Sequence, residues 1–261
     1  MLNILGLNRS LIYELTKREF SGRYRGSFGG IVWSFVQPLF LLCVYTVAFG
    51  MILKTRWGFS GSTSDYAFIL FAGLIVFNLF SECLIKSVHL ITANPNFVKK
   101  IVFPLELLPL VSALGSVMHA MIAILIWAAG YSLMYGLPHA SILFAPLILF
   151  CFFPILLGVG WFLSAAAVIV RDIGQLTGMI SHTLLFLTPI FYSVQTAPPV
   201  LQSLLVMNPL TFVVGEMRAV LFYGQLPNFI GMAVYFVCAS IFAWLGLLAF
   251  TRLRPIFADL V

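Results

Sequence analysis

The chain has 261 residues, of which 62% are apolar and only 8% carry a charge, and its formal net charge is +6. An average soluble domain has about a quarter charged residues, so this composition excludes a soluble surface and indicates helices that face lipid. The basic residues cluster beside apolar runs, as membrane topology signals do, which argues against a nucleic-acid partner.

The cysteines and the first apolar run exclude further classes. All four cysteines lie inside apolar stretches without metal-ligand spacing, so we expect neither a metal site nor a disulfide. The first apolar run is too long for a cleavable signal peptide and has no obvious small-residue cleavage site. The cysteines are Cys43, Cys83, Cys151 and Cys238.

Residues 1–27 are predicted to form an amphipathic helix that lies in the cytoplasmic interface of the membrane. Apolar residues at spacings of three and four place one stripe on such a helix, and two basic residues lie off it. A basic topology signal without an interface helix is the alternative. The stripe comprises Ile4, Leu7, Leu11 and Leu15, and the two basic residues are Arg9 and Lys17.

Charged residues are so rare that the gaps between them mark the spans, because a spanning helix needs about 20 apolar residues. We predict an all-helical domain of six transmembrane helices over residues 28–251. The long charge-free stretch after Glu106 divides into two spans at the turn sequence 135–139. The expected spans are 28–53, 66–91, 107–134, 141–170, 173–193 and 229–250.

The segment 195–224 is apolar but contains Pro198, Pro199 and Pro209, so we expect short periplasmic or re-entrant helices there rather than a span. A span in this place would move Arg252 and Arg254 outside. With six spans, most basic residues lie on the side of both termini, which are therefore expected to be cytoplasmic. Residues 252–261 then form a cytoplasmic tail.

Few polar residues fall inside the expected spans. Glu82 and Lys86 stand four residues apart and are expected to pair on one helix face, in a structural role. His119 and His182 are isolated and are interpreted as hydrogen-bonded histidines of the bundle.

Several stretches, taken together and in this order, resemble the ABC type 2 permeases, and in particular the group that exports O-antigen, teichoic acid and related polysaccharides. Leu105 departs from the pattern, because many relatives have a basic or polar residue there. The resemblance rests on Arg18-Glu19-Phe20, Arg23–Ser27, Gly30, Trp33-Ser34, Gln37–Leu39, Asn94–Pro109 (NPNFVKKIVFPLELLP), Arg171-Asp172-Ile173, Thr188–Tyr192, Asn208–Phe212, Glu216 and Arg218.

The resemblance implies a homodimer that works with two separate ATP-binding subunits in the bacterial inner membrane. The chain has no GxxxxGK[ST] phosphate loop, so ATP and Mg²⁺ are expected in the partner subunit, with no cofactor in this chain. The substrate implied is an undecaprenyl-pyrophosphate-linked polysaccharide of the O-antigen type, moved from cytoplasm to periplasm. Membrane lipids surround the complex.

The resemblance also makes residues 93–104 the segment that couples this chain to the ATP-binding subunit. Asn94-Pro95 sets a turn, and Pro104 ends the short helix that follows. Basic and apolar side chains between them suit a docking face, although an ordinary cytoplasmic loop is the alternative. The coupling residues are Asn94, Pro95, Phe97, Lys99, Lys100 and Phe103, with Val98 and Ile101 completing the apolar face.

Two further groups of residues are candidates for contact with the substrate. Arginines near the first span suit a pyrophosphate, because a guanidinium can bind two oxygens, although anionic lipid heads are an equal alternative. Aromatic side chains near the outer end could stack on sugars or simply pack. The arginines are Arg18, Arg23 and Arg25; the aromatics are Phe191, Tyr192, Phe212 and Tyr223; Glu216 and Arg218 form a candidate polar gate pair.

A non-enzymatic transporter subunit has two alternatives, a membrane-embedded transferase and a passive channel. A membrane-embedded transferase that acts on a lipid-linked sugar requires convergent acidic groups, and the chain's carboxylates match no such set. A passive channel requires rings of charge or filter-like carbonyl loops, and neither is apparent. The cytoplasmic carboxylates are Glu14, Glu19, Glu106, Asp172 and Asp259.

Overall fold

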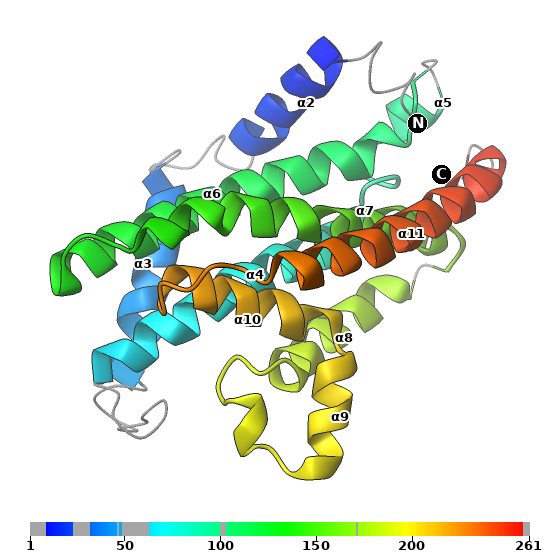
Figure 1. The fold of residues 1–261 in the computed structure, drawn as a ribbon. Coiled ribbons are helices and arrows are strands. Elements are labelled where there is room, and N and C mark those ends of the chain that lie inside the picture. Colours follow the sequence, from blue (N-terminus) through cyan, green and yellow to red (C-terminus); the bar gives the residue numbers. More distant parts are fainter. Residues whose placement is uncertain are drawn as a thin grey trace.

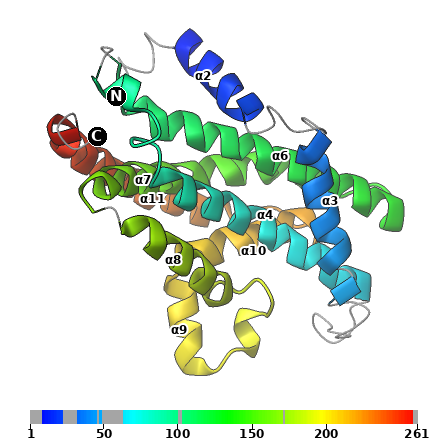
Figure 2. The same cartoon turned by 180° about the vertical axis from the view of Figure 1, so that it is seen from behind.

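The computed structural model describes residues 9–22, 32–45, 47–48, 63–99, 103–170 and 172–257. Every regular element in these ranges is a helix, which confirms the all-helical prediction. The longest helices run side by side along one axis of a bundle, and the short helix α9 projects from its side (Figures 1 and 2).

Four of the described helices are long and apolar enough to cross a membrane. They are α4 (Thr63–Ser87), α6 (Leu107–Tyr135), α7 (Ala145–Ile169, preceded by the 3₁₀ turn η3, Ala140–Phe144) and α11 (Phe229–Leu253). The two short helices α9 (Pro199–Met207) and α10 (Pro209–Leu221) pass the same test together, but they meet at 88° and so form either a broken span or a re-entrant loop.

Two shorter apolar helices fall within the other predicted spans. The first is α3 (Trp33–Tyr45), which runs across the long helices in both views, and the second is α8 (Ile173–Leu187). Residues 28–31, 46 and 49–53 of the predicted span 28–53 lie outside the described residues. The structure therefore gives four or five candidate spans, and the count of six stays a prediction.

The charge-free stretch is interrupted where its turn residues lie. Helix α6 ends at Tyr135, and Gly136 follows with φ of +89°, a backbone conformation that favours glycine. Residues 136–139 then lead into η3 and α7. The Gly-Leu-Pro sequence thus reverses the chain between two long helices.

Helix α4 lies in the centre of the bundle, where its side chains from Tyr66 to Phe77 are buried almost without exception. Helix α11, by contrast, exposes large apolar side chains such as Ile230, Val237 and Trp244 along its outer face. An apolar surface of this kind is stable only against lipid or another protein, which agrees with a membrane-spanning helix.

Helices α7 and α11 pack more closely than side chains normally allow. A Cβ atom on Gly246 would lie 2.6 Å from the carbonyl oxygen and 3.0 Å from the Cα of Gly158. Small residues permit such contact between helix backbones, which is a common basis of helix association in membranes.

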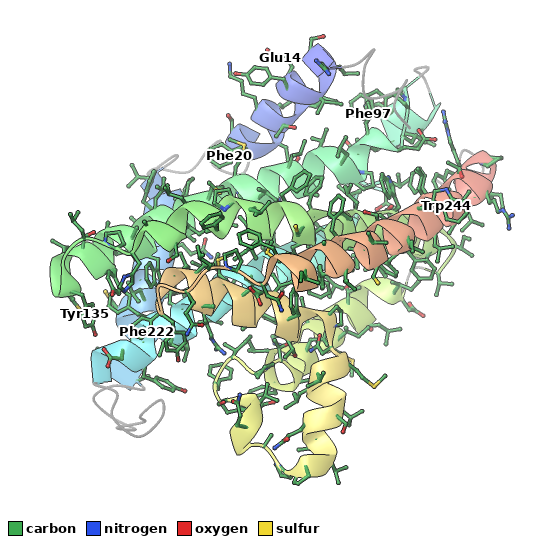
Figure 3. The ribbon with its side chains drawn as sticks, viewed as in Figure 1. Glu14, Phe20, Phe97, Tyr135, Phe222 and Trp244 are labelled. Atoms are coloured by element: carbon green, nitrogen blue, oxygen red, sulfur yellow. The ribbon has the colours of Figure 1, made fainter. Side chains whose placement is uncertain are left out.

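Helix α2 (Arg9–Gly22) lies beside α6 in both views. Leu11 and Leu15 of the predicted stripe are half-buried against the bundle, while Glu14 is exposed on the far side (Figure 3). Phe20 is buried between α2 and α6. The amphipathic pattern therefore faces α6, and a location in the membrane interface stays a prediction; Ile4 and Leu7 lie outside the described residues.

Candidate functional site

The short helix α5 (Pro95–Lys99) follows the turns at the end of α4. Asn94 Nδ2 donates a hydrogen bond to the Leu90 carbonyl at 2.8 Å, and the Phe97 N–H donates to the Asn94 carbonyl at 3.1 Å. Proline at the first position of a helix has a suitable φ and no N–H that needs a partner. The Asn94-Pro95 pair thus fixes the direction in which α5 leaves the bundle.

An aromatic pair attaches the segment after α5 to the bundle. The rings of Phe97 and Phe103 stack at 4.6 Å, and Phe103 is only 6% exposed. Phe97 and Val98 are half-buried. Phe103 therefore anchors the segment, while Pro95 and Asn96 are exposed on α5, and a contact of α5 with an ATP-binding subunit stays a prediction. Lys100, Ile101 and the side chain of Lys99 lie outside the described residues.

The first residues of α6 are connected to two distant helices. Arg254, at the end of α11, pairs with Glu106 (Nη1 to Oε1, 2.7 Å). The Glu106 backbone carbonyl accepts a hydrogen bond from Trp161 Nε1 of α7 at 2.9 Å. The sequence predicted neither the Arg254–Glu106 ion pair nor the Trp161 hydrogen bond, because in the sequence Arg254 is only a topology signal and Glu106 only one of several scattered carboxylates.

Charged side chains also connect α2 to the inner helices. Lys86 Nζ lies 2.9 Å from Glu82 Oε1 and 3.3 Å from Glu19 Oε1. Ser116 Oγ of α6 donates to the same Glu82 oxygen at 3.0 Å. The predicted pairing of Glu82 and Lys86 is confirmed, and the pair extends to α2 and α6.

A cavity of about 480 Å³ opens beside this cluster, between α3, α4 and α6. Gln37, Asn78 and His119 contribute to its lining. The ring centroids of His119 and Phe20 are 4.8 Å apart, so His119 takes part in the contact between α2 and α6. His182, by contrast, is exposed on α8. Within the described ranges, no group of three or more His, Cys, Asp or Glu is arranged to hold a metal.

The three candidate arginines are only partly covered by the structure. Arg18 is exposed on α2, one residue before Glu19 of the charged cluster. Arg23 and Arg25 lie outside the described residues. Their proposed contact with pyrophosphate therefore stays a prediction.

Arg218 of α10 is buried, with 6% exposure, and its guanidinium donates to three backbone carbonyls. Nε bonds to Ile69 of α4 at 3.1 Å, Nη1 to Pro189 at 2.7 Å and Nη2 to Ile190 at 2.6 Å. The last two carbonyls belong to the non-helical segment 188–193 that follows α8, here called the break. Arg218 thus joins three parts of the chain that are far apart in sequence.

Glu216 and Arg218, the predicted gate pair, form hydrogen bonds to different partners. The Glu216 carboxylate accepts from the Asn228 N–H at 2.9 Å, at the start of α11. Arg218 instead points inward to the carbonyls described above. The structure shows Arg218 in a connecting position, and a role of the pair in a gate stays a prediction.

The four candidate aromatics lie in different environments. The Phe191 carbonyl accepts from Tyr66 OH at 2.7 Å, and Tyr192 OH donates to the Phe186 carbonyl at 2.7 Å, so both hold the break in place. The Phe212 ring stacks on Tyr235 at 5.4 Å. Tyr223 is 46% exposed and is the most accessible of the four.

Asn208 forms the corner between α9 and α10. Its Oδ1 accepts from the Leu210 N–H at 3.0 Å, which caps the start of α10. Its Nδ2 donates to Thr188 Oγ1 at 3.1 Å and to the Leu187 carbonyl at 3.3 Å, at the end of α8. One side chain therefore connects the corner to the break.

Long apolar helices, a bent helix pair and a short helix at one end of the bundle define the class: a multi-pass helical membrane protein. The sequence profile of the ABC-2 type transporter family matches residues 10–222, well over half of the chain. The chain therefore belongs to the ABC-2 type transporter family, as the sequence motifs indicated.

Similar proteins match over almost their whole length. The chain is 24% identical over 259 residues to the O-antigen export system permease protein RfbA of Klebsiella pneumoniae, with 98% of this chain and 97% of that protein covered. It is 23% identical over 255 residues to the protein of the same name in Myxococcus xanthus, with 96% and 95% covered. The family and these relatives describe membrane permeases and agree with a non-enzymatic subunit.

Proposed function

We propose that this chain is the membrane-spanning subunit of an exporter that moves an undecaprenyl-pyrophosphate-linked polysaccharide of the O-antigen type from cytoplasm to periplasm. The similarity to O-antigen export permeases over nearly the whole chain carries this proposal. The order of the helices supports it, because the broken segment α8–α10 and the short helix α5 coincide with the motifs that suggested this group.

The energy for transport comes from another chain in this proposal. The sequence has no phosphate loop, and the ABC-2 family implies association with an ATP-binding subunit. Two copies of this chain would pair with two such subunits and form the channel between them. Helix α5, where Pro95 and Asn96 are exposed and Phe97 and Val98 are half-buried, supports a docking site at its end of the bundle.

The proposed orientation places both termini in the cytoplasm of a bacterium and the chain in its inner membrane. Figure 3 shows Phe97 near one end of the bundle and Tyr135 near the other. The excess of basic residues favours the Phe97 end as the cytoplasmic one. Helices α9 and α10 then form the gate toward the periplasm, where Tyr223 is accessible to a sugar.

Co-purification and glycan localisation test the proposal. The tagged chain is expected to isolate a soluble ATP-binding subunit, and cells without the chain are expected to keep lipid-linked glycan at the inner face of the inner membrane. Restoring the chain should return the glycan to the cell surface. Modification of a lipid-linked sugar by the purified chain alone would instead favour the membrane-embedded transferase.

The proposed pyrophosphate contact predicts a loss of substrate affinity. Changing Arg18, Arg23 and Arg25 together to glutamine is expected to weaken binding of lipid-linked pyrophosphate at least about tenfold, because charge-assisted hydrogen bonds to the phosphate oxygens are lost. Binding is measured with the permease in nanodiscs. The matched control changes Arg9 and Lys17, both exposed on α2, to glutamine. If the triple variant and the control bound lipid-linked pyrophosphate equally well, the arginines would act only by general attraction to anionic lipid headgroups.

A further inference from the structure

A groove of about 290 Å³ lies at the α5 end of the bundle, between two segments that are far apart in sequence. One wall comes from α5 and the stretch that leads into α6, and the other from the last turns of α11 and the 3₁₀ turn η5 (Arg254–Ile256). Figure 1 shows α5 and the end of α11 at the same end of the bundle. The groove, here called the α5–α11 groove, is lined by Phe97, Val98, Phe103, Leu105, Thr251, Arg254 and Pro255.

The two walls are fixed relative to each other. The ion pair between Arg254 and Glu106 joins them at 2.7 Å, and Arg254 Nη2 also lies 3.5 Å from the Phe103 carbonyl. Behind the second wall, Phe257 is fully buried, and its ring centroid lies 5.3 Å from that of Phe250. The C-terminal turn is therefore packed onto the bundle, which holds the described lining of the groove in place.

The lining combines an apolar floor with a cation at its rim. Phe97, Val98 and Leu105 provide the floor, and Arg254 remains 43% exposed although it pairs with Glu106. A guanidinium has five N–H donors in a planar fork, so Arg254 can bind a second carboxylate while it keeps the first. The volume leaves room for a large apolar side chain, and protein interfaces rely on a few such anchors in pockets.

We infer that the α5–α11 groove is a second part of the docking surface for the ATP-binding subunit, and that it receives one large apolar side chain of that subunit next to an acidic one. The inference rests on the proposed function, because it extends the surface that α5 offers there. The groove is continuous with α5 through Phe97 and Val98, and the partly exposed guanidinium of Arg254 at its rim can bind an acidic side chain in addition to Glu106.

This arrangement would spread force from the partner over three helices. Arg254 directly follows the last residue of α11, while the backbone carbonyl of Glu106 accepts a hydrogen bond from Trp161 of α7. An ATP-binding subunit seated in the groove therefore pushes on α6, α7 and α11 together.

Filling the groove tests the inference. Thr251 is exposed and donates to the carbonyl four residues earlier, Leu247. Thr251→Phe places a ring at the groove and is expected to weaken the complex with the co-purifying ATP-binding subunit at least about tenfold. The matched control is Thr183→Phe on α8, since Thr183 is likewise exposed and donates to Met179 four residues earlier. Affinity is measured with the full-length permease in nanodiscs.

A second measurement guards against misfolding of the variant. The photoreactive residue benzoylphenylalanine at position 251 is expected to crosslink to the ATP-binding subunit, and the same residue at position 183 is not. Wild-type affinity for Thr251→Phe, or a chain that binds the subunit without a crosslink from position 251, overturns the inference and leaves the proposed function standing. Failure of the wild-type chain to bind any ATP-binding subunit overturns both.

Discussion

Arg218→Leu is expected to lower the stability of the permease by about 3–5 kcal/mol, because three buried backbone carbonyls lose a charged donor. The carbonyls of Ile69, Pro189 and Ile190 lie too deep in the bundle to be hydrated, and each good hydrogen bond to a charged group is worth about 1.5–3 kcal/mol. A fall of roughly 10 °C in the thermal midpoint in nanodiscs would correspond to such a loss.

Two further variants separate the charge of Arg218 from its shape. Arg218→Lys keeps the cation but not the planar fork, so an intermediate loss is expected. Gly73→Ala places a Cβ atom 2.9 Å from Arg218 Nη2 and is expected to displace the guanidinium, with a smaller loss of the same sign. Arg252→Met is the control, because Arg252 is exposed near the end of α11. An unchanged midpoint for Arg218→Leu would show that the three hydrogen bonds do not hold the break.

Gly246→Leu is the second substitution with a large expected effect. The new side chain would meet the backbone of Gly158 within 3.0 Å, so α7 and α11 would have to separate. Overpacking of this kind costs roughly 3 kcal/mol, and here the neighbour is backbone, which cannot rotate away. Loss of monodisperse protein in size-exclusion chromatography, together with a lower thermal midpoint, is the expected result.

Gly215→Leu on α10 provides the matched control for Gly246→Leu. A Cβ atom on Gly215 would have no atom within 4 Å, so leucine fits there without displacement. Leucine also favours a helix by nearly 1 kcal/mol over glycine, and the control should be as stable as the wild type or slightly more so. Equal loss of stability in both variants would contradict the importance of the α7–α11 contact.

The long helices could be predicted from sequence because lipid tolerates so few charges. The expected span 107–134 corresponds to α6, Leu107–Tyr135, since the charge-free run begins after Glu106 and glycine stands at its end. The length of the first span stays a prediction, because residues 28–31, 46 and 49–53 lie outside the described part of the chain. Its charge-free run gives no sign that the described helix α3 runs across the bundle.

The contacts that organise the candidate sites could not be predicted because they join residues far apart in sequence. Arg254 and Glu106 are 148 residues apart, and neither has a local pattern that identifies the other. Arg218 suggested a polar pair with Glu216 because the two are close in sequence, whereas its guanidinium is used by backbone carbonyls. Backbone acceptors exist at every residue, so the sequence cannot indicate which of them an arginine reaches.

The corner residue Asn208 restricts how this sequence can diverge. Aspartate and serine usually replace asparagine at the start of a helix with little penalty, because all three accept the same N–H. Here the amide also donates to Thr188 and Leu187, so aspartate would keep the cap and lose the donor. Homologues that retain the 88° corner between α9 and α10 should therefore keep asparagine, or change position 188 at the same time.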